Sequence, residues 1–344
     1  MADPMKSLGG GEDAARRLTR LATYASVATA LILIGAKLGA WYATESIALF
    51  SSLIDSLLDL FASLITLFAV RHALTPADAE HRFGHGKAEP LAAMLQSGFI
   101  AGSAVLLLVE AVDRLIAPQP IARTEIGIAV MILSIVATLG LVAFQSYVIR
   151  RSQSVAIKAD SVHYQADLLA NAGVIAALVL SGYFALPLVD PLFGIGIAFY
   201  ILKGAWDIGR DAYQMLMDRE LPDEDREAIQ RIALGYSGVL GVHDLRTRQS
   251  GPDRFIQMHL DLNGALTLNR AHAIADAVEK EVMARFPGAE VLIHQDPVTP
   301  DSPPDVTDRD GGDAVGIRAS VEPPRRSVRK TAGAPPSAPE GEPE

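Results

Sequence analysis

The chain has 344 residues, 50% of them hydrophobic, and its mean hydropathy is +0.25. These values are too apolar for an ordinary soluble protein of this length and favour a membrane protein. The chain has no cysteine, which excludes disulfides and thiolate metal ligands. The formal net charge of -10 says little about partners, because many of the acidic residues lie beyond residue 210.

Six hydrophobic segments follow a short polar N-terminus. Residues 1–14 are polar and glycine-rich, so we expect them to be disordered, and they lack the basic region and cleavage site of a signal peptide. A helix needs about 20 residues to cross a hydrocarbon core of ~30 Å. Segments of suitable length lie at 18–42, 46–70, 89–116, 123–149, 155–181 and 187–208. The sequence therefore predicts an all-α, six-helix membrane domain over residues 15–208.

Basic residues indicate the orientation of these spans, because cytoplasmic loops carry an excess of Lys and Arg. They gather before the first span, after the second, after the fourth and after the sixth: Arg16, Arg17, Arg20, Arg71, Arg82, Lys87, Arg150, Arg151, Lys158 and Arg210. We therefore expect both termini to be cytoplasmic. Lys37, near the end of the first span, is expected to extend its ammonium group to the membrane interface.

Residues 209–297 have the pattern of a small α+β domain. PDEDREAIQRIALGY has the Pro and acidic residues of a helix N-terminus, followed by apolar residues at helical spacing. VHDLRTRQSG and DRFIQMHLDLNG alternate like paired strands, NRAHAIADAVEKEVMARF is an amphipathic helix and AEVLIHQD closes as a strand. The order αββαβ predicts a sheet covered by two helices. Residues 298–344, rich in Pro, Asp, Gly and Ser, are predicted to be disordered.

Two pairs of polar residues interrupt the second and fifth spans. Asp55 and Asp59 are four residues apart, as are His163 and Asp167, so each pair lies on one face of its helix. A carboxylate at the centre of a membrane helix costs ~2.5–3.5 kcal/mol on insertion scales and usually faces a partner or a pathway. Three carboxylates and one imidazole would form a tetrahedral zinc site. The alternative is that these residues only hold the helices together.

Protons would compete with a metal ion for such a site, because metal ligands must be deprotonated. An unperturbed His titrates near pH 6.5, and clustered carboxylates repel one another unless a cation or protons neutralise them. The sequence therefore predicts a site that exchanges metal for protons, as in a proton-coupled antiporter.

Two further groups of candidate ligands lie outside the spans. The loop after the second span contains Asp78, His81 and His85, which would leave one coordination position open. Half of the eight histidines fall in the α+β domain, where the candidates are His243, His259, His272, His294 and Asp296. A solvated polar loop and ordinary structural histidines are the alternatives.

These motifs resemble those of the cation diffusion facilitators, in particular the bacterial zinc and ferrous-iron efflux pumps. The resemblance covers residues 15–297 and rests on SLIDSLLD, FGHGKAE, HYQAD, LPDE, HDLRTRQSGP and IHQDP. It implies six transmembrane helices in the inner (plasma) membrane and a cytoplasmic, metallochaperone-like (ferredoxin-like) αββαβ domain. It also implies a homodimer that exports Zn²⁺ from the cytoplasm while protons move inward.

The resemblance also implies roles for individual residues. The transport site would comprise Asp55, Asp59, His163 and Asp167, and the loop site Asp78, His81 and His85. A binuclear cytoplasmic site that tightens the dimer would comprise His243, His259, His272, His294 and Asp296, with Gln295 as a further candidate. Lys87 and Asp218 match a charged pair near the dimer contact. The imidazole of the transport site favours Zn²⁺, with Fe²⁺ and Cd²⁺ as alternative substrates.

Three other functions fit part of this pattern. A membrane-embedded zinc hydrolase would need an open coordination position and a nearby base, and the sequence contains no HExxH motif. A membrane-anchored metal sensor would use the αββαβ domain and not the spans. A channel would conduct without regard to an imposed pH gradient. We expect metal ions, protons and lipid as partners, and no nucleic acid.

Overall fold

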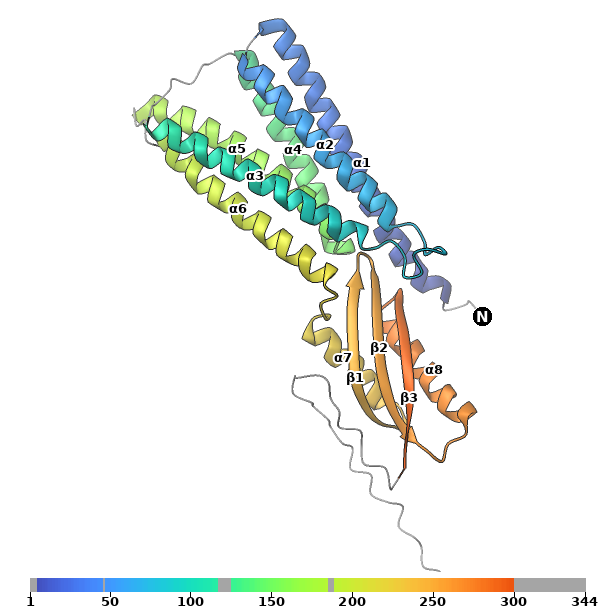
Figure 1. Cartoon of the computed structure of the whole chain (residues 1–344). Coiled ribbons are helices and arrows are strands. Elements are labelled where there is room, and N and C mark those ends of the chain that lie inside the picture. Colours follow the sequence, from blue (N-terminus) through green and yellow to red (C-terminus); the bar gives the residue numbers. More distant parts are fainter. Residues whose placement is uncertain (1–4, 46, 117–124, 185–188, 300–344) are drawn as a thin grey trace, which may run out of the picture.

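The computed structural model describes residues 5–45, 47–116, 125–184 and 189–299 (Figure 1). Six long helices come first: α1 (Met5–Thr44), α2 (Ile47–Ala73), α3 (Ala88–Ile116), α4 (Glu125–Ser152), α5 (Val155–Phe184) and α6 (Val189–Leu216). A smaller domain follows, with α7 (Asp223–Gly235), β1 (Val239–Ser250), β2 (Asp253–Asn263), α8 (Leu268–Arg285) and β3 (Ala289–Val298). The predicted fold class is confirmed. From residue 300 onward, the tail expected to be disordered lies outside the described residues.

The first and last long helices extend beyond the predicted spans. α1 begins at Met5, so part of the segment 1–14, which we expected to be disordered, belongs to it. α6 continues to Leu216, past the expected boundary at 208. Hydropathy finds only the apolar part of such helices, whereas Ala, Arg and Met favour the helix equally well outside the membrane.

Within the part of the chain that the structure describes, α1, α2, α3, α4 and α6 are long and apolar enough to cross a membrane. α5 is similar in length and carries Lys158, Asp160 and Asp167. It packs against α3, α4 and α6 and also contacts α1 and α2. Its polar side chains can therefore face other helices instead of lipid, which is where charged groups in membrane helices are usually found.

The bundle has an apolar surface, and its interior holds polar side chains alongside apolar ones. Exposed residues on its surface include Leu58, Phe68, Leu106, Val136 and Trp206. Residues that are almost completely buried include Ser26, Ser63, Gln96, Gln145 and Asp160. Lipid tails are as apolar as Leu, so a membrane bundle gains little from an apolar interior, and hydrogen bonds between helices contribute to holding it together.

The α+β domain has the strand order β1-β2-β3, with β1 and β2 antiparallel and β2 and β3 parallel. Met258 and Leu260 of β2 are buried in one core with Ile274 and Val278 of α8. Because side chains alternate along a strand, His259 lies on the opposite face of the sheet. One face of the sheet therefore builds the core and the other is free to carry ligands.

The loop between α2 and α3 joins the helical bundle to this domain. Phe83 packs edge-on against Phe255 of β2, and the guanidinium of Arg248 lies over both rings. Arg16 of α1 forms an ion pair with Asp253, at 3.0 Å. Burial raises the pKa of Asp253, and the charge of Arg16 partly offsets that effect. Aromatic packing and an ion pair thus both contribute to this junction.

Close backbone packing at the same junction predicts a specific effect of glycine substitution. A Cβ at Gly86 would clash with the backbone carbonyl of Ser250, at the tip of the β1–β2 hairpin. Overpacking of this kind typically costs ~1–3 kcal/mol. We expect Gly86→Ala to lower the melting temperature of the purified protein. Gly98→Ala on α3 is the control, because a Cβ added there would meet no atom of another segment within 4 Å, and it should not lower the melting temperature. Equal melting temperatures for the two variants would contradict the packing described.

Candidate metal-binding sites

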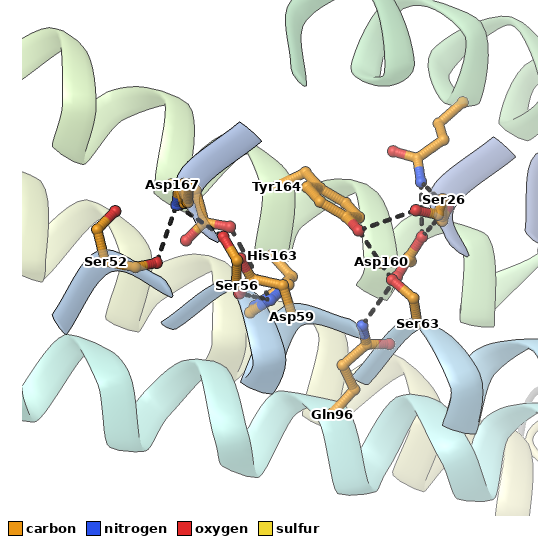
Figure 2. Close-up of polar contacts among 12 residues, drawn as sticks. Ser26, Ser52, Ser56, Asp59, Ser63, Gln96, Asp160, His163, Tyr164 and Asp167 are labelled. Carbon is orange, nitrogen blue, oxygen red and sulfur yellow. Dashed lines mark hydrogen bonds and ion pairs between the residues drawn. The ribbon is translucent and has the colours of Figure 1, made fainter. Parts of the chain in front are cut away.

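The first candidate site lies inside the bundle, where α2 meets α5 (Figure 2). His163 Nε2 lies 3.0 Å from Asp59 Oδ1 and 3.9 Å from Asp167 Oδ2. Each of the three residues offers a ligand atom within 4.8 Å of the others. The structure therefore brings together three of the four residues predicted for this site. Asp55 lies one helical turn before Asp59, is exposed, and is not part of this cluster.

One carboxylate oxygen of this cluster has no hydrogen-bond partner. Asp167 Oδ2 is buried and has no hydrogen-bond partner within the described part of the chain; its ion-pair contact is His163, at 3.9 Å. An unsatisfied buried acceptor is costly, and a carboxylate even more so. Imidazole nitrogens and carboxylate oxygens are both ligands that bind zinc. The residues present therefore fit a divalent cation better than they fit a purely structural contact.

Lys37 does not reach the membrane interface as expected. It is only 8% exposed, and its Nζ donates hydrogen bonds to Ser52 O (3.0 Å) and Ser56 Oγ (2.6 Å) of α2. Both acceptors belong to the same stretch of α2 as Asp55 and Asp59. Because these acceptors inside the bundle satisfy its ammonium group, Lys37 does not need to extend toward water. A tethered cation thus lies beside the acidic cluster.

The loop between α2 and α3 forms the second candidate site. His85 Nε2 lies 3.2 Å from Asp78 Oδ2, and His81 Nδ1 lies 3.5 Å from Asp78 Oδ1. The backbone N–H of His81 lowers the pKa of Asp78, and smaller contributions come from the N–H of Glu80 and from the two histidines. The loop's own backbone therefore favours the ionised form of Asp78 that a metal requires.

Two neighbours of the loop cluster were not found from the sequence. Thr75 Oγ1 lies 3.0 Å from His85 Nδ1, and such a contact fixes the orientation and tautomer of an imidazole. The ring of His72, in the last turn of α2, lies 4.5 Å from that of His85. In the sequence, the one indication of His72 as a neighbour of the loop cluster is its position just after the predicted span 46–70.

The third candidate site is a row of histidines across the open face of the sheet. The strand register pairs His243 with His259 and His259 with His294. Neighbouring rings are 5.1 and 4.7 Å apart. Asp296 Oδ2 lies 2.8 Å from His259 Nδ1 and 3.4 Å from His243 Nε2. Adjacent strands thus place four of the predicted ligands side by side.

Other residues at this site depart from the predicted set. Asp261 and Asp244 lie 3.5 and 3.7 Å from His243 and His259, respectively, and were missed. Asp261 follows His259 by two residues, as Asp296 follows His294, so alternation along the strand could have indicated it. His272, on α8, is exposed and lies outside the compact cluster of His243, His259 and Asp296. Gln295 on β3 neighbours the row in sequence but alternates to the other face.

The predicted charged pair is present within one chain. Lys87 Nζ lies 3.0 Å from Asp218 Oδ1, and Arg248 lies 3.4 Å from the same oxygen. Both members of the Lys87–Asp218 pair are about two-fifths exposed, at 42% and 41%. Exposed pairs contribute little stability, so this pair acts mainly by fixing where the loop and the end of α6 meet.

A second polar cluster in the bundle was missed entirely. Asp160, one turn before His163 on α5, is fully buried and contacts Ser26, Gln96 and Gln145 (Figure 2). The segment DSVHYQAD contains two acids, and an acid inside a span is itself an indication of function. The sequence prediction used the spacing of four between His163 and Asp167 and did not consider Asp160, three residues before His163.

The geometry predicts unequal roles for the two acids of α2. Asp59→Asn removes a carboxylate that lies within 3.0 Å of His163, whereas Asp55→Asn changes a residue outside the cluster. We expect the Asp59 variant to lose more than ~10-fold in zinc affinity at this site, and the Asp55 variant to lose less. Equilibrium zinc titration of protein lacking the loop and sheet histidines measures this. Equal losses would show that Asp55 joins the site when metal binds.

Comparison with known proteins identifies two matching family models. The model described as the cation efflux transmembrane domain matches residues 23–217. The model described as the cation efflux protein, cytoplasmic domain, matches residues 221–298. A solved structure of CzrB in a Zn form is 33% identical and matches 25% of this chain and 99% of its own, with a TM-score of 0.23.

Curated relatives match along most of their length. The cation-efflux pump FieF of Pectobacterium carotovorum is 48% identical over 283 residues, which cover 82% of this chain and 94% of the relative. FieF of Yersinia enterocolitica is 49% identical over 281 residues, covering 82% and 93%. The corresponding pump of Klebsiella pneumoniae is 48% identical, with the same coverage. The chain therefore belongs to the cation efflux family, the cation diffusion facilitators, and is a membrane transporter of divalent metal cations rather than an enzyme.

Proposed function

We propose that the chain exports Zn²⁺ from the cytoplasm in exchange for protons. The observation that carries the proposal is the cluster of Asp59, His163 and Asp167 inside the bundle. One carboxylate oxygen of this cluster has no hydrogen-bond partner. An imidazole with carboxylates suits Zn²⁺ and Fe²⁺ better than Mg²⁺ or Mn²⁺, which prefer more oxygen ligands. Zn²⁺ is therefore the leading substrate, and Fe²⁺ and Cd²⁺ are the alternatives. Asp55 is the candidate for a fourth ligand.

Exchange with protons follows from the ligand chemistry. His163 and the carboxylates bind metal only after they have lost their protons. When the metal leaves, the same buried groups would repel one another, and protons relieve that repulsion. A site that opens alternately to the two sides therefore returns protons for metal. The expected orientation, with both termini in the cytoplasm of an inner membrane, would expose the cytoplasmic domain to the metal to be exported.

We propose that the loop and sheet clusters are metal sites that regulate transport in a homodimer. Asp78, His81 and His85 would hold one ion at the junction between the two domains. His243, His259, His294 and Asp296 would hold one or two ions on the open face of the sheet, with His272 and Gln295 as further ligands after rearrangement. The name of the matched cytoplasmic family model, ZT_dimer, supports dimerisation through this domain.

Zinc flux in reconstituted vesicles tests the transport proposal. With an imposed pH gradient, the wild-type protein should move zinc, and a protonophore that collapses the gradient should slow it. Asp59→Ala should lower the rate by more than ~10-fold, because it removes a carboxylate in contact with His163. Lys203→Ala, which changes an exposed residue of α6, is the control and should transport normally. Flux that ignored the gradient would indicate a channel, no flux in the wild type would indicate a sensor, and full activity of the Asp59 variant would contradict the proposed site.

Metal-dependent association tests the regulatory proposal. The domain comprising residues 209–299 has a core of its own, built from α7, α8 and the sheet. Its dimer affinity, measured by sedimentation with and without zinc, should rise with zinc, because ions that bind preferentially to the dimer stabilise it by mass action. His259→Ala should abolish the increase. The same affinity with and without metal would remove the regulatory role while leaving the transport proposal intact.

A further inference from the structure

Asp160 is a buried carboxyl group with an unusual set of neighbours. It lies on α5, three residues before His163, and is 0% exposed. Oδ2 lies 2.5 Å from Ser26 Oγ of α1 and 2.7 Å from Gln145 Nε2 of α4. Oδ1 accepts a hydrogen bond from Gln96 Nε2 of α3, at 3.3 Å. Three helices thus contribute an uncharged polar group to one acid, which Figure 2 shows apart from the metal cluster.

The hydroxyl of Ser26 constrains the protonation of this acid. Ser26 Oγ lies 3.0 Å from Ala22 O, 3.0 Å from Gln145 Nε2 and 2.5 Å from Asp160 Oδ2. Ala22 O can only accept and Gln145 Nε2 can only donate. A serine hydroxyl carries one proton, so if it donates to Ala22 O, the proton in the contact with Asp160 must belong to Asp160. The full set of contacts is satisfied when Asp160 is a neutral acid.

The charge of the surroundings supports the same state. Within the described part of the chain, Asp160 forms no ion pair. The titratable groups that face it are His163 and Tyr164 on its own helix; α1, α3 and α4 present Ser26, Gln96 and Gln145, and α2 presents Ser63 beside the Tyr164 hydroxyl. A buried carboxylate without a cation in contact is strongly disfavoured.

We propose that Asp160 is a proton-binding site separate from the metal ligands, protonated while the transport site is empty and deprotonated when a divalent cation binds there. This inference rests on the proposed transport function. His163 lies about one turn further along α5, so a metal ion on His163 places positive charge near Asp160. In a low-dielectric interior such charge acts strongly over this range and favours the carboxylate. Asp160 thereby adds a proton to those displaced from the ligands.

The proton transfer balances in atoms and charge. The O–H bond of Asp160 breaks and the proton passes to water, which leaves a carboxylate. Gln96 and Gln145 continue to donate to it, and Ser26 turns its hydroxyl from Ala22 O to Asp160 Oδ2. On the cytoplasmic side, a cavity of about 170 Å³ lined by Glu89 and Ser154 offers water an approach. Ser154 precedes Asp160 by six residues, or ~9 Å along a helix. When metal leaves, the steps reverse.

Counting the protons released as zinc binds tests the proposal. Zinc is added to the purified full-length protein in weak buffer, and a pH indicator reports the release. Asp160→Asn keeps the shape of the neutral acid and has no proton to lose, so it should bind zinc at the transport site yet release about one proton fewer per protein. Asp276→Asn, which alters an exposed acid of α8, is the control and should release as many protons as wild type. The loop and sheet sites contribute equally in all variants.

Each outcome has a distinct meaning. An unchanged proton count in Asp160→Asn, with zinc still bound, would overturn the proposal and leave Asp160 as a neutral strut between helices. Failure of the proposed transport function would give a different result: replacing Asp59 would then leave zinc binding at the level of the wild type. If Asp160→Asn does not fold, infrared difference spectra of the wild type serve instead. Zinc should remove a protonated carboxyl band that Ser26→Ala shifts, and a spectrum without such a band would also overturn the proposal.

Discussion

The cost of burying carboxylates in a membrane is the constraint on which the rest of this structure depends. Asp59, Asp160 and Asp167 lie on α2 and α5, two helices of the membrane bundle. An isolated ionised carboxylate there is prohibitively unstable, so each one must have a cation, a proton or hydrogen-bond donors. The chain supplies an imidazole at one cluster and serine and glutamine groups at the other, and Lys37 nearby. Under the proposed function, a transported ion would complete what the protein leaves unsatisfied.

The same constraint explains why the polar residues of α5 lie between other helices. α5 contacts every other membrane helix, so it can carry polar groups that a lipid-facing helix could not. Its two clusters lie about one turn apart, close enough for the charge of one to influence the other. The loop between α2 and α3 connects these clusters to the α+β domain. Its Phe83 packs against Phe255 and Arg248 of the sheet that carries the histidine row. Under the proposed function, a metal ion bound at any of the three candidate sites would therefore act on structures that are in contact.

Much of this arrangement followed from the sequence because it depends on local periodicity. Spacings of four placed His163 and Asp167 on one face, and alternation placed His294 and Asp296 together. What the sequence could not provide depends on contacts between distant segments. Lys37 found acceptors on α2 instead of reaching the interface, and Asp160 gained its donors from α1, α3 and α4. The β-bulge between His243 and Arg246 brought Asp244 toward the histidine row, a shift that strict alternation does not anticipate.

The central claim is that ligands from α2 and α5 hold one ion that protons displace. X-ray absorption at the zinc edge tests it most directly, on full-length protein whose loop and sheet histidines have been replaced. The account predicts one bound zinc with a single imidazole and otherwise oxygen ligands, lost as the pH is lowered and restored as it is raised. A protein that bound no zinc under these conditions, or a zinc without imidazole that persisted at low pH, would contradict it.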